Sequence, residues 1–136
     1  GDESNSKRMV NVDSLLIMLD KIEQEQLFGD ADILLVGDYN CYSQEQPVQT
    51  LIQAGYEDIL MHYDSTGYSY VYHSEAGYLD RVFASPTMAA QVKAVHPYHL
   101  NADYFYSRGY KRRLDKTMFR YADHDPILIS LQLSEK

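Results

Sequence analysis

Residues 33–40 read Ile-Leu-Leu-Val-Gly-Asp-Tyr-Asn, a short apolar run that a glycine stops and polar residues follow. Such a run, ended by a turn residue, is typical of a strand buried on both faces. The side chains of Asp38 and Asn40 follow this predicted strand directly. Ligand sites in open α/β sheets lie beyond strand ends, so the stretch is a candidate site. A plain turn is the alternative, because Asp and Asn side chains hydrogen-bond to nearby backbone.

Helical patterns flank this strand on both sides. Before it, apolar residues at helical spacing predict an amphipathic helix over about residues 7–26, with Gly29 ending it. After it, Pro47 at a first helical position and Gly55 at the end predict a second, shorter helix. Residues 1–6 are polar, and we expect them to be frayed and disordered.

Strand patterns dominate the second half of the chain. Residues 68–84 alternate around a turn and predict a β-hairpin whose returning strand is 79–84. Residues 92–96 and 127–133 predict two more strands, while 101–122 show no period and predict a long loop. Helices early and strands late indicate an α/β or α+β fold, with a mixed β-sheet and helices packed on one face.

Length and composition exclude several classes of protein. The chain has 136 residues, enough for one domain, and 45% of them are hydrophobic, which is typical of a globular protein. Its apolar runs are far shorter than the roughly 20 residues of a membrane-spanning helix, so we expect no membrane span. A net charge of −8 argues against broad, non-specific binding of nucleic acid. Cys41 is the single cysteine, so there is no internal disulfide framework.

Two further acidic clusters accompany the first. Asp80 lies in Leu-Asp-Arg at 79–81, and Asp123 and His124 lie in Ala-Asp-His-Asp-Pro at 122–126. Because Asp38, Asp80 and Asp123 are 42 and 43 residues apart, only the fold can bring them together. Each of these two clusters also has a non-functional interpretation. Asp80 could form a structural ion pair with Arg81, and residues 122–126 could be a solvated turn.

The three clusters, in this order and spacing, resemble the endonuclease/exonuclease/phosphatase superfamily. The resemblance is closer to its bacterial extracellular nuclease branch and covers roughly residues 32–133. It is carried by three stretches: GDYNCYSQEQPVQTLIQAGYEDI at 37–59, YSYVYHSEAGYLDRVFASP at 68–86 and FRYADHDPILISL at 119–131.

The resemblance implies a metal-dependent phosphodiesterase site with a role for each motif residue. Asp38 would orient or deprotonate the attacking water or contact the metal, and Asn40 would hydrogen-bond the scissile phosphate. Asp123 would help to bind the divalent ion, which is Mg²⁺ or else Mn²⁺ or Ca²⁺. His124 would contact the phosphate, and Asp80 would fix its tautomer and favour its charged form. A hard cation with an imidazolium suits the charge that develops on the phosphoryl oxygens.

The resemblance also implies that the chain is half of a domain. The superfamily fold is a four-layer sandwich of two similar halves, about twice this length. Its first half supplies an asparagine, a glutamate metal ligand and another histidine, which we do not find here. Residues 7–136 would therefore be the C-terminal half, with the N-terminal half as its partner. A half domain should expose an apolar sheet face, so we expect a homo-oligomer.

A basic and aromatic segment at 101–121 is the second candidate surface. Its six basic residues include Arg112, Arg113 and Arg120, and five aromatic residues interleave with them. Such composition suits a phosphate backbone and stacked bases, although a solvated charged loop is the alternative. Tyr70 either faces the substrate or is a packed strand residue.

These observations predict divalent-metal-dependent phosphodiester hydrolysis, most simply of DNA or RNA, in a secreted or cell-envelope protein of a bacterium. That location rests on the resemblance alone. Two alternatives stay open. One is a phosphatase or phospholipase of the same superfamily, which would share the three motifs. The other is a catalytically inactive fragment that binds or oligomerises without cleaving.

Overall fold

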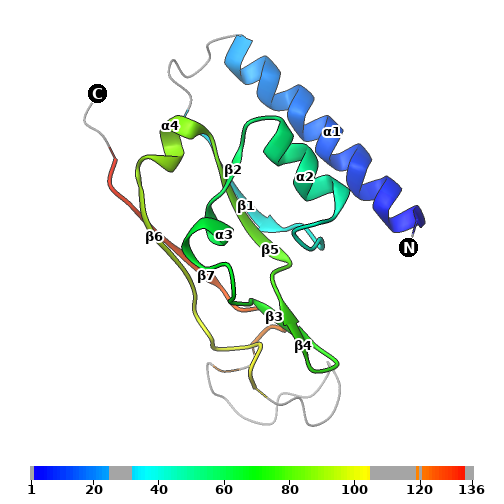
Figure 1. The fold of residues 1–136 in the computed structure, drawn as a ribbon, viewed down its shortest axis with the longest axis vertical. Helices are drawn as coiled ribbons and strands as arrows, with labels where there is room; N and C mark the ends of the chain where they lie inside the picture. The colour runs from blue at the N-terminus through cyan, green and yellow to red at the C-terminus, as the bar shows by residue number, and fades with distance from the viewer. Residues whose placement is uncertain (1, 25–31, 105–118, 120, 134–136) are drawn as a thin grey trace.

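A computed structural model describes residues 2–24, 32–104, 119 and 121–133 of the chain. Its centre is a three-stranded antiparallel sheet in the order β1-β5-β2 (Figure 1). These strands are β1 at Leu34–Asp38, β5 at Asp80–Ala84 and the short β2 at Glu57–Asp58. Two further pairs flank it: β3 (Tyr70–Tyr72) with β4 (Glu75–Gly77), and β6 (Val92–Pro97) with β7 (Ile127–Leu131).

Helices lie on both sides of this central sheet. α1 (Asp2–Gln24) and α2 (Gln46–Gln53) pack against each other, and α3 (Ile59–Tyr63) and α4 (Pro86–Ala89) lie on the other side with β6. Figure 1 shows α1 as the outermost layer, running alongside α2. The predicted α/β class is confirmed, whereas the expectation of helices on one face only is wrong.

Strand β5 explains the two-sided arrangement, because its side chains alternate between two hydrophobic clusters. Phe83 is fully buried against α1 and α2, in a cluster with Val12 and Leu51. Val82 and Ala84 are fully buried on the opposite face, in a cluster built from α3, α4 and β6. A strand apolar on both faces needs a central position, and β5 takes it.

This central position corrects two strand predictions. The segment 79–84 does not return along β3, because β4 closes the hairpin and β5 pairs with β1 and β2. The segment 33–36 is not buried on both faces, because β1 lies at one edge of the sheet and Val36 is 58% exposed. All strand pairs in the described residues are antiparallel, so the mixed sheet is not observed there.

Helix boundaries differ slightly from the sequence patterns. α1 begins at Asp2, so residues 2–6, which we expected to be frayed, form its first turn. α2 begins one residue before Pro47 and ends at Gln53, two residues before Gly55, whose φ of +97° suits glycine. Backbone N–H groups of Gly55 and Tyr56 bond the carbonyls of Ile52 and Leu51, which is a Schellman ending.

A buried ion pair joins β5 to the start of α3. Arg81 is 1% exposed, and its Nη1 donates to Asp58 Oδ2 over 2.9 Å. The other Nη donates to Ser43 Oγ and to the carbonyl of Tyr78. Burial raises the pKa of Asp58, and the nearby Arg81 counteracts that rise. Arg81 therefore pairs with Asp58 rather than with its neighbour Asp80, since adjacent strand residues face opposite sides of a sheet.

We predict that Arg81→Met destabilises the fold by about 3–5 kcal/mol, because it leaves the Asp58 carboxylate buried without its cation. Adding Asp58→Asn should recover part of this loss, since no buried charge then remains. Urea denaturation of the wild type, the two single variants and the double variant measures both effects. A double variant at least as unstable as the sum of the two single variants would contradict this account.

Candidate active site

The pairing of β1 with β5 brings the first two motifs together. The strands are antiparallel with Asp38 opposite Asp80, so the last residue of β1 faces the first residue of β5. Just beyond this pair, the N–H of Tyr39 donates to the carbonyl of Leu79 over 3.0 Å. The two carboxylates are therefore held at one end of the central sheet by backbone hydrogen bonds.

The segment that leads into β3 brings the third motif to the same place. Tyr70 forms an isolated antiparallel bridge with His124. The N–H of Asp125 donates to the carbonyl of Ser69 over 2.7 Å. The ring of Tyr70 lies 4.5 Å from the imidazole of His124, tilted by 32°. The chain around 122–126 is thus fixed to residues 69–70, and its histidine packs on an aromatic ring.

Asp38, Asp80 and His124 form one cluster. Each offers a ligand atom, and these atoms all lie within 4.8 Å of one another. His124 Nδ1 lies 2.8 Å from Asp80 Oδ2, and the buried Ser69 donates its hydroxyl to the same oxygen. An ionised Asp80 only accepts, so it fixes a hydrogen on Nδ1 of His124. The His124 side chain is 22% exposed, which leaves the ring open to a substrate.

Asn40 lies beside this cluster in an uncommon backbone conformation. Its φ is +49°, in the left-handed region that asparagine tolerates better than most residues. Its N–H donates to Asp38 Oδ1 over 2.8 Å, a local Asx turn. The plain turn that the sequence offered as the alternative to a site is therefore present, and it places Asn40 next to the carboxylate cluster.

The sequence interpretation missed Asp125, the residue that organises the third motif. Asp125 is 3% exposed, and its Oδ1 accepts the N–H groups of Leu100, Asn101 and Ala102 at 2.7–3.0 Å. Its Oδ2 lies 2.8 Å from Nδ1 of His99. Burial alone would raise its pKa, but these hydrogen bonds outweigh burial and lower it. The sequence signal that could have identified Asp125 was the presence of a second carboxylate, besides Asp123, in the motif at 122–126.

Several predicted site residues lie apart from the cluster or outside the described residues. Asp123 precedes His124, half-buried, but is not one of the three clustered residues. Tyr70 contacts His124 with its ring, so it is both a strand residue and part of the site. Arg112, Arg113 and Arg120 lie outside the described residues. Cys41 is fully buried beside Asn40 and unpaired, as a packing residue would be.

The donors of the cluster suit a hard divalent cation. Mg²⁺ usually binds through one or two carboxylates and keeps several waters. Within the cluster, the exposed Asp38 could supply such an oxygen, while Asp80 is already engaged by His124 and Ser69. The imidazole then serves better as a hydrogen-bonding group than as a ligand, since imidazole suits softer metals.

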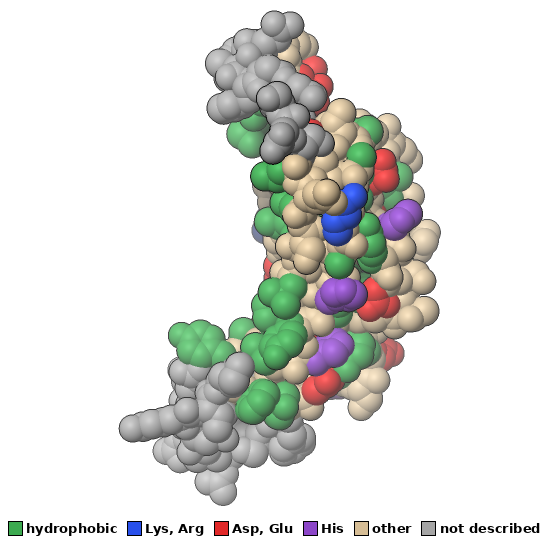
Figure 2. Space-filling view, turned by 90° about the vertical axis from the view of Figure 1, so that its left-hand side faces the viewer, with side chains coloured by type: hydrophobic (Ala, Val, Ile, Leu, Met, Phe, Trp, Pro, Cys, Tyr) green, Lys and Arg blue, Asp and Glu red, His purple; other side chains and the backbone are tan. Residues whose placement is uncertain are grey.

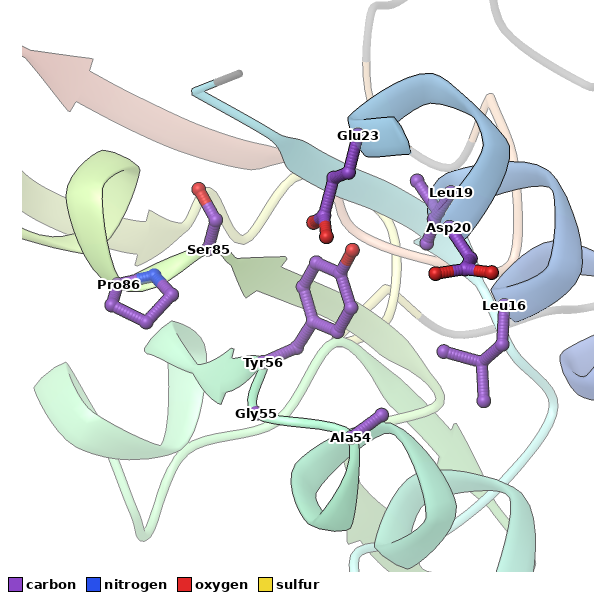
Figure 3. A pocket seen from close by; sticks show the side chains of 9 residues that line it. All are labelled: Leu16, Leu19, Asp20, Glu23, Ala54, Gly55, Tyr56, Ser85 and Pro86. Atoms are coloured by element: carbon purple, nitrogen blue, oxygen red, sulfur yellow. The ribbon is translucent and has the colours of Figure 1, made fainter. Parts of the chain in front are cut away.

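A cavity of about 280 Å³ lies at the other end of β5, where Ser85 and Pro86 follow the strand. Figure 3 shows Glu23 of α1 and Tyr56 pointing toward one another across it. Burial, and next the charge of Glu23, raise the pKa of the Tyr56 hydroxyl. The cavity is separate from the carboxylate cluster, which lies at the strand's opposite end.

Comparisons with known proteins bear on the family and the fold of the chain. Residues 6–124 match the family described as the Endonuclease/Exonuclease/phosphatase family. No curated protein matches the chain. Among solved structures, the 3′ phosphatase NExo from Neisseria, bound to a product DNA hairpin, is similar with a TM-score of 0.53 and 18% sequence identity. The match covers 85% of this chain and 51% of that one, so the chain spans about half the length of this neighbour.

We predict that Asp125→Asn destabilises the protein by about 1–3 kcal/mol at neutral pH, because a charged acceptor of four hydrogen bonds is lost. Because the pKa of Asp125 is lowered in the folded protein, its ionised carboxylate stabilises the fold at every pH above the ordinary pKa of an aspartate. This contribution is lost as the pH falls from there through the lowered pKa. The variant should therefore lose less stability than the wild type between about pH 5 and about pH 3.

Urea denaturation over this pH range measures the effect. Asp13→Asn on the exposed surface of α1 is the matched control and should behave like the wild type. Equal acid sensitivity of the wild type and the Asp125 variant would contradict the assignment.

Proposed function

Because the chain belongs to the Endonuclease/Exonuclease/phosphatase family, we propose that it supplies the phosphodiester-hydrolysing half-site of a divalent-metal-dependent nuclease. The observation that carries the proposal is the convergence of Asp38, Asp80 and His124 within 4.8 Å. A structural neighbour described as bound to product DNA supports nucleic acid as the substrate class.

In this proposal each residue acts on the phosphate or on the attacking water. Asp38 orients the water and accepts its proton, and the side chain of Asn40 donates to a phosphoryl oxygen. His124 donates from Nε2 to a phosphoryl oxygen, and Asp80 stabilises the charged imidazole through Nδ1. A divalent cation bound by Asp38 and Asp123 would supply Lewis-acid stabilisation of the phosphoryl charge.

The composition of the segment 101–121 suits a polyanionic substrate. We propose that Arg112, Arg113 and Arg120 contact the phosphate backbone, a proposal that rests on their composition alone. Charge reversal at Arg112 and Arg113 should flatten the salt dependence of DNA binding. Export of the protein by a bacterium and its place in the extracellular nuclease branch are likewise proposals that rest on the sequence resemblance.

We predict metal-dependent nicking of supercoiled plasmid, and a rate at least about 100-fold lower in His124→Ala, because loss of one donor to a developing negative charge costs about 10²–10³-fold. A chelator should abolish nicking. His62→Ala, an exposed histidine at the end of α3, is the matched control and should keep the rate.

The same assay separates the nuclease from its alternatives. Release of inorganic phosphate from DNA with a 3′ phosphate, without nicking, would replace the nuclease by a phosphatase. No metal-dependent reaction with either substrate would contradict catalysis by this 136-residue chain. Nicking that persists in both the chelator and the His124 variant would indicate a contaminating nuclease and sink the proposal.

We also propose that the chain associates through an apolar surface. Leu128 and Leu131 of β7 are 54% and 40% exposed, and Leu133 just beyond them is 68% exposed. Figure 2 shows hydrophobic side chains running along one margin of the face that carries the sheet of β6 and β7.

No helix in the described residues is long and apolar enough to cross a membrane.

We predict a concentration-dependent homo-oligomer in which Leu128→Glu shifts the equilibrium to monomer, because the charge would lie in the apolar contact. Light scattering over a concentration series measures the mass. Lys93→Glu, an exposed change on the neighbouring strand β6, is the control for charge alone. A monomer at every concentration would contradict the proposal.

A further inference from the structure

Arg8 of α1 reaches the strand-end loop that carries Asn40. Its Nη1 donates to the carbonyl oxygen of Asn40 over 2.9 Å, across 32 residues of sequence. Its Nη2 lies 2.5 Å from Glu45 Oε2, and the other oxygen of Glu45 accepts the N–H of Tyr42. One guanidinium thus joins a helix outside the motifs to both ends of the loop that follows Asp38.

These contacts constrain Asn40 from both sides. Its N–H is held by Asp38, and its carbonyl is held by Arg8, so both peptide groups around its left-handed conformation have partners. A non-glycine residue in this region relaxes readily to an ordinary conformation unless its surroundings hold it. Relaxation would turn the side chain of Asn40 away from its present direction.

The burial of the Arg8 side chain is energetically unfavourable, which argues against an incidental surface contact. The Arg8 side chain is only 23% exposed, and its Nε is buried without an acceptor in the described residues. A cavity of about 160 Å³ is lined by Arg8, Asn11 and Asp38 among others, so Arg8 borders the same space as the proposed catalytic residue Asp38. The guanidinium holds its donors to the two acceptors in a fixed planar fork, whereas the ammonium of a lysine is a compact charge on a flexible stem.

We infer that Arg8 is a positioning residue, which holds Asn40 in the conformation that presents its side-chain amide to the substrate phosphate. The inference rests on the proposed function, because it assigns Asn40 to the phosphate. Arg8 itself acts through the loop and does not contact the reacting atoms. It lies in the part of the chain where the sequence motifs gave no signal.

The test is nuclear magnetic resonance on the ¹⁵N-labelled 136-residue chain, titrated with a short DNA duplex in the presence of Ca²⁺. In the wild type, the side-chain amide of Asn40 should shift as duplex is added. In Arg8→Ala, the backbone amide of Asn40 should move in the free protein, and the duplex-induced shift of its side chain should be lost. Where turnover is measurable, kcat should fall about tenfold or more, with KM changing much less.

Two further variants keep the test decisive. Arg8→Lys keeps the charge but not the fork, so it should reproduce most of the Arg8→Ala effect, and it carries the test if Arg8→Ala does not fold. Lys7→Ala is the control, because Lys7 pairs only with Glu3 on the exposed side of α1 in the described residues and should leave Asn40 unchanged.

The outcomes separate this inference from the function on which it rests. Equal duplex-induced shifts of Asn40 in the wild type and both Arg8 variants would overturn the role of Arg8 and leave the nuclease proposal standing. No shift of Asn40 in any protein, the wild type included, would overturn the assignment of Asn40 to the phosphate, and both proposals with it.

Discussion

The antiparallel register of β1 and β5 is the constraint on which the site depends. It sets Asp38 opposite Asp80, and in the same register it sends Phe83 into one core and Val82 into the other. A slip by one residue would exchange these faces, bury Asp80 where an apolar residue belongs, and separate the two carboxylates. The packing of β5 therefore enforces the geometry of the polar cluster, since the slipped register would exchange Phe83 and Val82 between the two cores.

The remaining site contacts build outward from this pair. Ser69 connects the second motif to the third, since its hydroxyl donates to Asp80 and its carbonyl accepts from Asp125. Asp125 in turn fixes the turn at 100–102 through three backbone hydrogen bonds. Carboxylates thus have two distinct tasks here. Asp58 and Asp125 are buried and stabilise the fold, whereas Asp38 is exposed at the strand end and remains accessible to a ligand.

Sequence reasoning identified the motif residues because their chemistry is visible locally, as polar side chains directly after apolar runs. The α/β class and the ends of α2 were also predictable, since Pro47 and Gly55 act on their own backbone. Strand pairing was not, because the hairpin over 68–84 and the observed insertion of β5 between β1 and β2 share the same alternation. The structural roles of Arg8 and Asp125 were missed for a related reason: their partners Asn40 and His99 lie 32 and 26 residues away.

The distances along the chain between site residues have a kinetic consequence. Asp38 and Asp80 are separated by 42 residues, and Asp80 and His124 by 44, so no hairpin or helix–turn unit carries even two of them. The chain loses the conformational entropy of closing loops of this length before the contacts between these residues form, and this slows folding. The cluster has no local precursor, and a truncated or partly refolded chain does not contain a weaker version of it. During refolding, the cluster forms only when both β1 and the segment around His124 have closed on the start of β5.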